Sequence, residues 1–345
     1  MVKLTFKPKQ VTKKLLGVLP TRAREVLESR YGLGKNPERM TLEAIGGRYG
    51  ITRERVRQIE NYALSLIRKS KAFEEHAPVF EELKAVIEGY GGVIAEEELL
   101  PLLSKESVTQ NHFHLLLVVG IPFVHEKETP ELKNRWLVDK DLAEKVQKSL
   151  KTLYKNLADD ELIPEHDLIE RILDDLKGIN DTYLNEEIVR RWLSLSKQLG
   201  RNPLGEWGRF DSPNVRVKGI RDYAYLVIKR HGSPMHFREV AHAITELFNK
   251  KAHEATCHNE LIKDNRFVLV GRGLYALKEW GYANGVVKDV IIDILRANGA
   301  LSRQDIVERV KRERYVKDNT IVVNLQDTNL FKRDKQGHYI LRDDE

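Results

Sequence analysis

The sequence has a single cysteine, Cys257, and it has no long apolar run. One cysteine excludes an internal disulfide and a zinc site made only of cysteines. No apolar stretch approaches the roughly 18 residues that a membrane-spanning helix needs. Residues 1–6 also lack the apolar segment of a signal peptide. We therefore expect a soluble protein of a reducing compartment, located in the cytoplasm, with no membrane association.

The usual signatures of catalysis are also missing. The sequence shows no phosphate-binding loop with its lysine, no nucleophile elbow, no pair of catalytic carboxylates and no dinucleotide-binding glycine pattern. His253, Cys257 and His258 lie close together, but a fourth ligand at zinc-finger spacing is absent. We interpret Cys257 as a core residue, and His112 and His114, beside an apolar run, as structural. We expect no enzymatic activity, no metal and no cofactor.

Charge is distributed unevenly along the 345 residues, whose net charge is +6. Residues 1–75 carry 17 Lys+Arg against 8 Glu (+9), residues 76–200 carry 15 basic against 24 acidic side chains (−9), and residues 201–345 carry 26 against 20 (+6). A basic block attracts a polyanion such as nucleic acid in a salt-dependent manner, although charges also simply solvate a surface. The acidic middle predicts protein contacts or a spacer.

The apolar periodicity predicts a mostly α, multi-domain protein. We expect a helix-turn-helix followed by two or three winged-helix modules, each an α+β hairpin unit, joined by a helical segment. The expected segments are a helical unit at 1–75, a possible winged helix at 76–140, a helical spacer at 141–199, a linker at 200–217, a winged helix at 218–282 and a second C-terminal winged helix at 283–345. Breaker residues such as Pro203 and Gly205 suggest the linker.

The most specific pattern lies in residues 41–60. Thr41 and Thr52 are each placed to cap a helix, and Gly50-Ile51 forms the short glycine-containing turn between them. On the second helix, one stripe should be buried: Val56, Ile59, Ala63 and Leu66. The opposite face then exposes Arg53, Glu54, Arg57, Gln58 and Asn61.

This exposed face has the chemistry of base recognition. Arginine pairs with guanine, glutamine pairs with adenine, and glutamate accepts from the amino group of cytosine. The N-terminal end of a recognition helix is also the part that meets base edges. We therefore predict a DNA-contact set of Thr52, Arg53, Glu54, Arg55, Arg57 and Gln58. Helix-turn-helix folds also serve as protein-interaction modules, and that alternative stays open.

Residues 19–33, 41–43 and 52–60 resemble the C-terminal domain (region 4) of bacterial primary sigma factors. The resemblance implies recognition of a minus-35 promoter element through Arg53, Glu54, Arg57 and Gln58. It also implies docking on the β flap of RNA polymerase through Arg22, Arg24, Val26, Leu27 and Arg30. Ala23 and Ser65 depart from the acidic and basic residues usual there. Nothing resembles the aromatic-rich segment that melts the minus-10 element, so we expect no promoter opening by the chain alone.

Residues 218–280 resemble the HARE-HTH winged-helix family, which includes the N-terminal domain of the RNA polymerase delta subunit. The resemblance lies in residues 223–228, 234–240 and 267–277, and it implies a DNA- or polymerase-associated role. Arg272, between two glycines at the wing tip, is expected either to contact DNA or to be an exposed residue of a type I′-like turn. In the last module Lys332, Arg333 and Lys335 either grip phosphates or solvate the wing.

Three hypotheses of function follow. The first is a sequence-specific DNA-binding transcription regulator, nucleoid-associated, that recognises a minus-35-like element in double-stranded DNA. The alternative is an RNA polymerase accessory subunit or sigma competitor that acts mainly through protein contacts. A third is the recognition component of a restriction or defence system.

Overall fold

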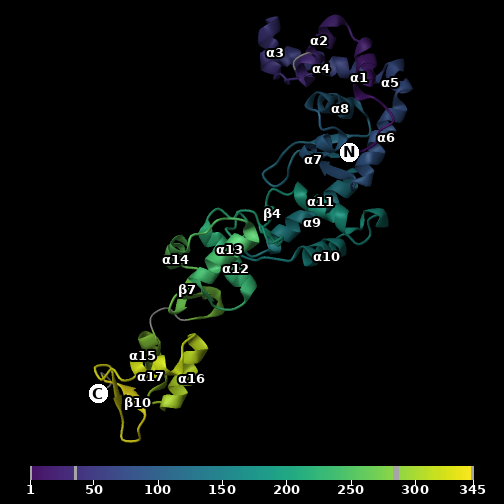
Figure 1. The fold of residues 1–345 in the computed structure, drawn as a ribbon. Helices are drawn as coiled ribbons and strands as arrows, with labels where there is room; N and C mark the ends of the chain where they lie inside the picture. The colour runs from purple at the N-terminus through teal and green to yellow at the C-terminus, as the bar shows by residue number, and fades with distance from the viewer. Residues whose placement is uncertain (1, 35–36, 283–286, 343–345) are drawn as a thin grey trace. The chain divides into compact units, whose positions relative to one another are not determined.

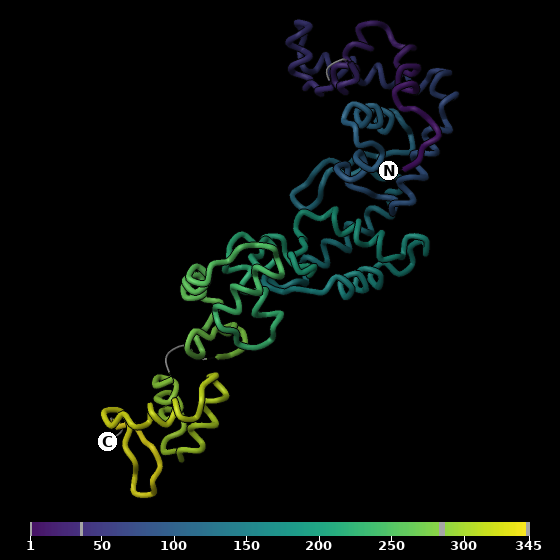
Figure 2. Tube along the Cα trace, viewed as in Figure 1, coloured from purple at the N-terminus to yellow at the C-terminus, as the bar shows by residue number. Residues whose placement is uncertain are grey.

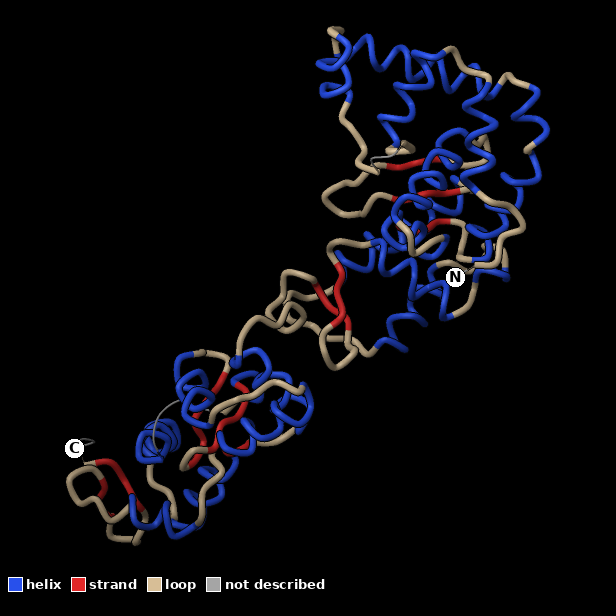
Figure 3. Tube along the Cα trace, turned by 45° about the horizontal axis from the view of Figure 1, so that its top comes forward, coloured by secondary structure: helices blue, strands red, loops and turns tan. Residues whose placement is uncertain are grey.

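The computed structural model describes residues 2–34, 37–282 and 287–342. The chain forms two compact units, one of residues 1–200 and 207–210 and the other of residues 201–206 and 211–345. Helices dominate both units, and the strands form only small antiparallel sheets (Figures 1 and 3). The predicted fold class, a mostly α, multi-domain protein with helix-turn-helix and hairpin-bearing modules, is confirmed. Among the described residues, no helix is both long and apolar enough to cross a membrane.

The N-terminal module is entirely helical. It consists of α1 (Pro8–Gly17), α2 (Thr21–Tyr31), α3 (Leu42–Tyr49), α4 (Arg53–Arg68) and α5 (Lys71–Glu75). Helix α2 ends at Gly32, whose φ of 61° is the left-handed conformation that glycine adopts without steric cost. A small core of Val26, Ile45 and Val56 joins α2, α3 and α4. Packing against α2 therefore holds helices α3 and α4 in place, and α4 carries most of the predicted DNA-contact residues.

The second module of the first unit has the element order of a winged helix. Its elements are α6 (Ala77–Gly89), β1 (Val93–Ala95), α7 (Glu96–Leu103), α8 (Ser107–Val119), β2 (Val124–Glu126) and β3 (Arg135–Leu137). The three strands pair antiparallel in the order β1-β3-β2. The apolar run Leu115–Val119 lies in helix α8, and its leucines are buried.

The chain from residue 140 to residue 210 differs from the expected spacer and linker. It contains α9 (Lys140–Asn156), α10 (Glu165–Asp175), the short η1 (Asp181–Tyr183), α11 (Glu186–Leu195) and the hairpin strands β4 (Leu199–Arg201) and β5 (Trp207–Arg209). Ile163, between α9 and α10, forms an antiparallel bridge to Trp207. The breakers Pro203 and Gly205 therefore make a hairpin turn, and Trp207 is buried in a core that it shares with α9–α11. This segment is a packed module of three helices and a hairpin.

The second unit repeats one plan. Its first module has α12 (Ile220–His231), β6 (Met235–His236), α13 (Phe237–Phe248), α14 (Glu254–Lys263), β7 (Phe267–Gly271), β8 (Leu274–Leu277) and the short η2 (Lys278–Trp280). Its second has α15 (Val287–Asn298), α16 (Arg303–Glu313), α17 (Asp318–Asn324), β9 (Phe331–Arg333) and β10 (Tyr339–Leu341). The two modules follow one another in green and yellow along the trace (Figure 2). In both modules, a short extended segment after the first helix pairs with the hairpin. In the first module this segment is strand β6, which pairs with β8, and in the second it is Leu301, which forms a bridge to Tyr339.

Candidate nucleic-acid interface

Helices α3 and α4 begin as their caps predict. The Thr41 hydroxyl accepts a hydrogen bond from the Ala44 amide at 3.1 Å, and the Thr52 hydroxyl accepts one from the Arg55 amide at 3.2 Å. Each bond satisfies an amide that the helix leaves without an internal partner. Gly50 closes α3 with a φ of 65°. Both predicted caps and the glycine-containing turn are confirmed.

The turn is tight because Gly46 lets α3 approach the chain that leads into α4. The Ile51 amide donates to the Gly46 carbonyl at 3.0 Å. A Cβ placed on Gly46 would lie 2.6 Å from the Ile51 carbonyl oxygen, whereas a Cβ on Gly47 would meet nothing within 4 Å. The angle between the two helices therefore depends on the absence of a side chain at Gly46.

The inner face of α4 is largely as predicted. Val56 and Ala63 are completely buried, and Ile59 and Leu66 pack partly buried against the cores. The outer face of α4 is exposed, and it carries Arg53, Glu54, Arg57, Gln58 and Asn61. The structure thus brings the predicted base-contact residues together on one open surface.

Most of these side chains are paired with one another in the free protein. The Arg57 guanidinium donates to both carboxylate oxygens of Glu54, at 2.7 and 2.8 Å, and Arg55 donates to the Gln58 side-chain oxygen at 3.0 Å. The bond from Arg57 lowers the pKa of Glu54, and the same bond raises the pKa of Arg57. Ion pairs between exposed groups contribute little net stability. Base edges can therefore replace these partners at small cost.

A further residue on this face is Tyr62, which the sequence reasoning missed. It lies one helical turn after Gln58, and its exposed fraction is 58%. The four-residue spacing from Gln58 was the signal that would have identified it. An open hollow of about 550 Å³ adjoins the start of α4, lined by Gly46, Gly47, Gly50, Ile51, Thr52 and Arg55.

The residues expected to contact polymerase are mostly occupied within the module. Val26 and Leu27 are completely buried, so in the folded chain they have no surface to offer a partner. Arg24 donates to the Leu16 carbonyl at 3.0 Å and thereby caps the end of α1. Arg30 donates to the Met40 carbonyl at 3.0 Å and lies 3.6 Å from Glu60. Arg22 is exposed, with its guanidinium 5.7 Å from the centre of the Tyr49 ring.

Helix α8 is covered by the helix-turn-helix module. The Asn111 amide donates to the carbonyls of Gly32 and Pro37, at 3.1 and 2.8 Å. His112 Nδ1 lies 2.7 Å from the Thr12 hydroxyl in a buried pair, and burial lowers the pKa of this histidine. The residues of α8 share one core with α1, α2 and α4. The third helix of this winged-helix module is therefore used for packing and is closed to DNA.

His114 is part of a second polar cluster of the same module. His114 and His125 lie 3.5 and 3.3 Å from the Glu96 carboxylate, and Trp136 Nε1 donates to it at 2.8 Å. Burial opposes the charge on Glu96, but these hydrogen bonds outweigh it and hold the pKa of Glu96 below its usual value. The cluster ties α7, α8 and the sheet together, so His114 has a structural role.

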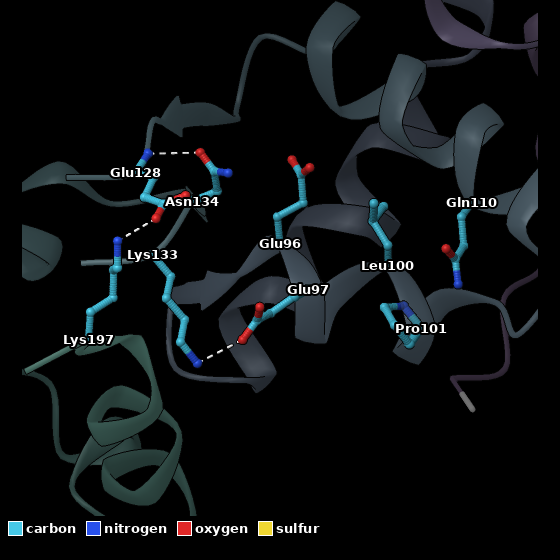
Figure 4. A pocket seen from close by; sticks show the side chains of 9 residues that line it. All are labelled: Glu96, Glu97, Leu100, Pro101, Gln110, Glu128, Lys133, Asn134 and Lys197. Carbon is cyan, nitrogen blue, oxygen red and sulfur yellow. Dashed lines mark hydrogen bonds and ion pairs between the residues drawn. The ribbon is translucent and has the colours of Figure 1, made fainter. Parts of the chain in front are cut away.

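Glu96 also borders a pocket of about 400 Å³ with Leu100, Pro101 and Gln110 (Figure 4). The other charges around it are paired: Lys133 donates to Glu97 at 2.7 Å, and Lys197 donates to Glu128. Because the cations here are matched by carboxylates, this pocket lacks the positive excess that nucleic acid would need. We assign it no part in the interface.

The wing of the first module of the second unit exposes Arg272. Gly271 pairs with Leu274, so Arg272 and Gly273 form a two-residue turn. Gly273 has a φ of 69°, but among the described residues Asn249 is the only non-glycine with positive φ. A type I′ turn needs positive φ at both central residues. The type I′-like turn was therefore a wrong prediction, while the exposure of Arg272 stands.

The last wing gathers the other predicted phosphate-contact residues. Lys335 is exposed near the tip, and Arg333 donates to the Tyr339 hydroxyl with its guanidinium 4.7 Å from the ring centre. Lys332 is half-buried on the same strand. Stacking on Tyr339 holds Arg333 along the strand and leaves its charge at the surface.

Cys257 is completely buried, and burial raises the pKa of its thiol to about 12. His258 stacks on Phe237, with 4.4 Å between the ring centres, while His253 is exposed. Within the part of the chain that the structure describes, no three His, Cys, Asp or Glu side chains are grouped to hold a metal ion.

The geometry defines the N-terminal module as a helix-turn-helix whose second helix presents an exposed polar face, the arrangement with which such folds enter the major groove. Comparison with known proteins agrees with this class. Residues 15–69 match the family Sigma-70, region 4. The segment is similar to the RNA polymerase sigma factor RpoD of Neisseria gonorrhoeae, with 44% identity over 59 residues, 17% of this chain and 9% of that protein.

Two principal sigma factors named HrdD show the same similarity. The protein of Streptomyces coelicolor is 44% identical over 55 residues, 16% of each chain, and that of Streptomyces griseus is 46% identical over 50 residues, 14% of this chain and 15% of the relative. The resemblance to sigma factor region 4 is thus confirmed for the N-terminal module. The match spans only a small part of each relative.

Proposed function

We propose that this protein is a sequence-specific DNA-binding transcription regulator that contacts a minus-35-like element through α4. The observation that carries the proposal is the exposed set Arg53, Glu54, Arg57 and Gln58, on the outer face of α4 in a module that matches region 4 of sigma factors. The resemblance of residues 218–280 to HARE-HTH modules supports a role near DNA. The proposed activity is binding alone, without promoter opening.

On binding, the pair of Arg57 with Glu54 and the pair of Arg55 with Gln58 exchange partners. Arg57 then pairs with guanine, Gln58 with adenine, and Glu54 accepts from cytosine. Thr52 keeps its cap, since its oxygen accepts from the Arg55 amide, and its O–H remains able to donate to a phosphate. The wing cations Arg272, Lys332, Arg333 and Lys335 contact phosphates elsewhere and make binding depend on salt.

The test is selection of bound duplexes from a random pool by the full chain and by an Arg57→Ala variant. We expect the variant to bind the preferred sequence about 10- to 100-fold more weakly and to lose base preference at one position. The matched control is Lys71→Ala, because Lys71 is an exposed cation of the same module outside α4. The control should keep the base preference. If Arg57→Ala selected the same sequences as the parent, α4 would not recognise bases.

The alternative, an RNA polymerase accessory subunit or sigma competitor, draws on the same family match. Val26 and Leu27 are buried, so two of the five residues expected to contact polymerase are not accessible to a partner. Of the other three, Arg22 is the most exposed. Incubation with purified bacterial polymerase core separates the two functions. Stable co-elution without any DNA preference would favour the alternative, and an Arg22→Ala variant should then elute separately.

A further inference from the structure

The first 20 residues of the chain are rich in lysine and lack carboxylates. They contain no aspartate and no glutamate, and the proposed DNA contacts do not use their five lysines, which are Lys3, Lys7, Lys9, Lys13 and Lys14. All five side chains are exposed, and we call this set the lysine patch. The match to sigma factor region 4 begins at residue 15, so the lysine patch lies outside that match.

Packing holds the lysine patch on the folded module. Val11, Leu15 and Leu16 of α1 are buried in the core that this helix shares with α8. Before the helix, the Thr5 amide and hydroxyl donate to the two carboxylate oxygens of Glu82, at 2.7 and 2.6 Å. The exposed residues of α1 lie on its other side, and they are Lys9, Gln10, Lys13, Lys14 and Gly17. The backbone that carries the lysines is therefore ordered before any partner binds, which lowers the entropy lost on binding.

The lysine patch does not serve the stability of the fold. Among the described residues, none of its five lysines forms an ion pair with a carboxylate. Lys9 and Lys13 are four residues apart on α1, and two like charges at this spacing destabilise a helix. Lys9 also lies in the first turn of α1, where the helix dipole disfavours a cation. Such an arrangement favours an anion supplied by another molecule.

The chemistry of the lysine patch fits phosphate better than it fits a protein surface. Lysine is a point charge on a flexible stem, so it pairs with phosphate without a fixed geometry. The exposed half of α1 offers no apolar or aromatic side chain, whereas protein interfaces depend on such anchors. Residues 1–75 have a net charge of +9, and the surrounding module therefore adds to the attraction of a polyanion.

The length of α1 matches several phosphates of a DNA strand. A helix of 10 residues is about 15 Å long. One strand of B-DNA carries a phosphate about every 3.4 Å along the duplex axis, so α1 spans roughly four phosphates. The DNA backbone is thus a partner whose charge and spacing both suit the lysine patch.

We propose that the lysine patch contacts the phosphate backbone of the duplex that flanks the element contacted by α4, without any preference for its sequence. This inference rests on the proposed function, because both surfaces bind the same DNA. The two surfaces then divide the work: α4 supplies base preference, and the lysine patch supplies affinity that depends on salt.

The test uses a Lys9→Gln/Lys13→Gln/Lys14→Gln variant of the full chain. Its affinity for the preferred duplex and for a scrambled duplex is measured over a series of salt concentrations. Each phosphate contact adds about 0.9 to the slope of log affinity against log salt, so the slope should become shallower by about 2–3. Affinity for both duplexes should fall by the same factor, and the sequences selected from a random pool should stay the same. Circular dichroism checks that the helices remain folded.

The matched control replaces three lysines of another helix, in a Lys145→Gln/Lys148→Gln/Lys151→Gln variant. These residues are exposed on α9, in the acidic middle of the chain. The control should keep the slope and the affinity of the parent. If the lysine-patch variant also kept the parental slope, the proposed phosphate contact would be wrong, and absence of DNA binding by the parent would overturn it as well.

The Arg57→Ala variant separates this proposal from the proposed function. It should lose base preference and reduce the slope by at most about 1, since it removes a single cation. Unchanged base preference in Arg57→Ala, together with a shallower slope in the lysine-patch variant, would refute the role of α4 and support the lysine patch. Lost base preference in Arg57→Ala, together with a parental slope in the lysine-patch variant, would support α4 and refute the lysine patch.

Discussion

The contact between Gly46 and the Ile51 carbonyl can be tested by adding one methyl group. In a Gly46→Ala variant, the new Cβ lies 2.6 Å from a backbone oxygen, which cannot rotate away as a side chain does. Helix α3 must therefore shift against α4. The matched control is Gly47→Ala, the same substitution one residue further along α3, where nothing lies within 4 Å.

The size of the effect follows from the difference between these variants. Alanine stabilises a helix interior by up to about 1 kcal/mol relative to glycine, and this gain is common to both. The steric conflict, which costs about 1–3 kcal/mol, occurs only at Gly46. We therefore expect Gly47→Ala to be neutral or stabilising, and Gly46→Ala to be less stable than Gly47→Ala by about 1–3 kcal/mol.

The assay measures hydrogen exchange of the α3 and α4 amides together with DNA affinity, because a chain of several modules does not unfold in one step. Gly46→Ala should increase exchange in α3 and weaken sequence-specific binding, since α4 is no longer held in its native orientation. Gly47→Ala should match the parent in both measurements. Equal exchange and equal affinity in the two variants would refute the close approach of α3 to the Ile51 carbonyl and, with it, our account of the turn.

Three further predictions concern the buried polar groups of both units. Burial lowers the pKa of His112 and His114, so the folded state disfavours their protonation. Their contribution to stability is full above the unfolded pKa of about 6.5 and is lost as pH falls below it, so the protection of the α8 amides against hydrogen exchange should depend less on pH in a His112→Asn variant. Asn111→Ala leaves the Gly32 and Pro37 carbonyls without this donor and should lower the protection of the α8 amides against hydrogen exchange by about 1–3 kcal/mol, whereas Asn61→Ala should have little effect. Cys257 should resist a thiol reagent at pH 8 and react only in denaturant, since burial holds its pKa at about 12; rapid labelling of the native chain would contradict its burial.

Much of the candidate site follows from interactions between residues close in the chain. The caps at Thr41 and Thr52, the turn at Gly50 and the outward face of α4 all depend on spacings of two to four residues. Such spacings are visible in the sequence because the helix period fixes which positions share a face. The pairing of Arg57 with Glu54 belongs to the same class, since the two residues are three apart.

The remaining features of the fold and of the candidate site depend on contacts between residues that are distant in the chain, and no local pattern in the sequence encodes such contacts. The sequence alone determined where the helices of the N-terminal module begin and which face of α4 is polar. Only the tertiary structure decided that Val26 and Leu27 are buried, that α8 is closed by Thr12 and Gly32, and that Trp207 turns an expected linker into a hairpin. The reason is that an apolar or amide side chain is equally suited to a partner in its own chain or in another molecule. Long-range packing makes that choice, and in this protein it leaves α4 exposed while it covers α8 and α11.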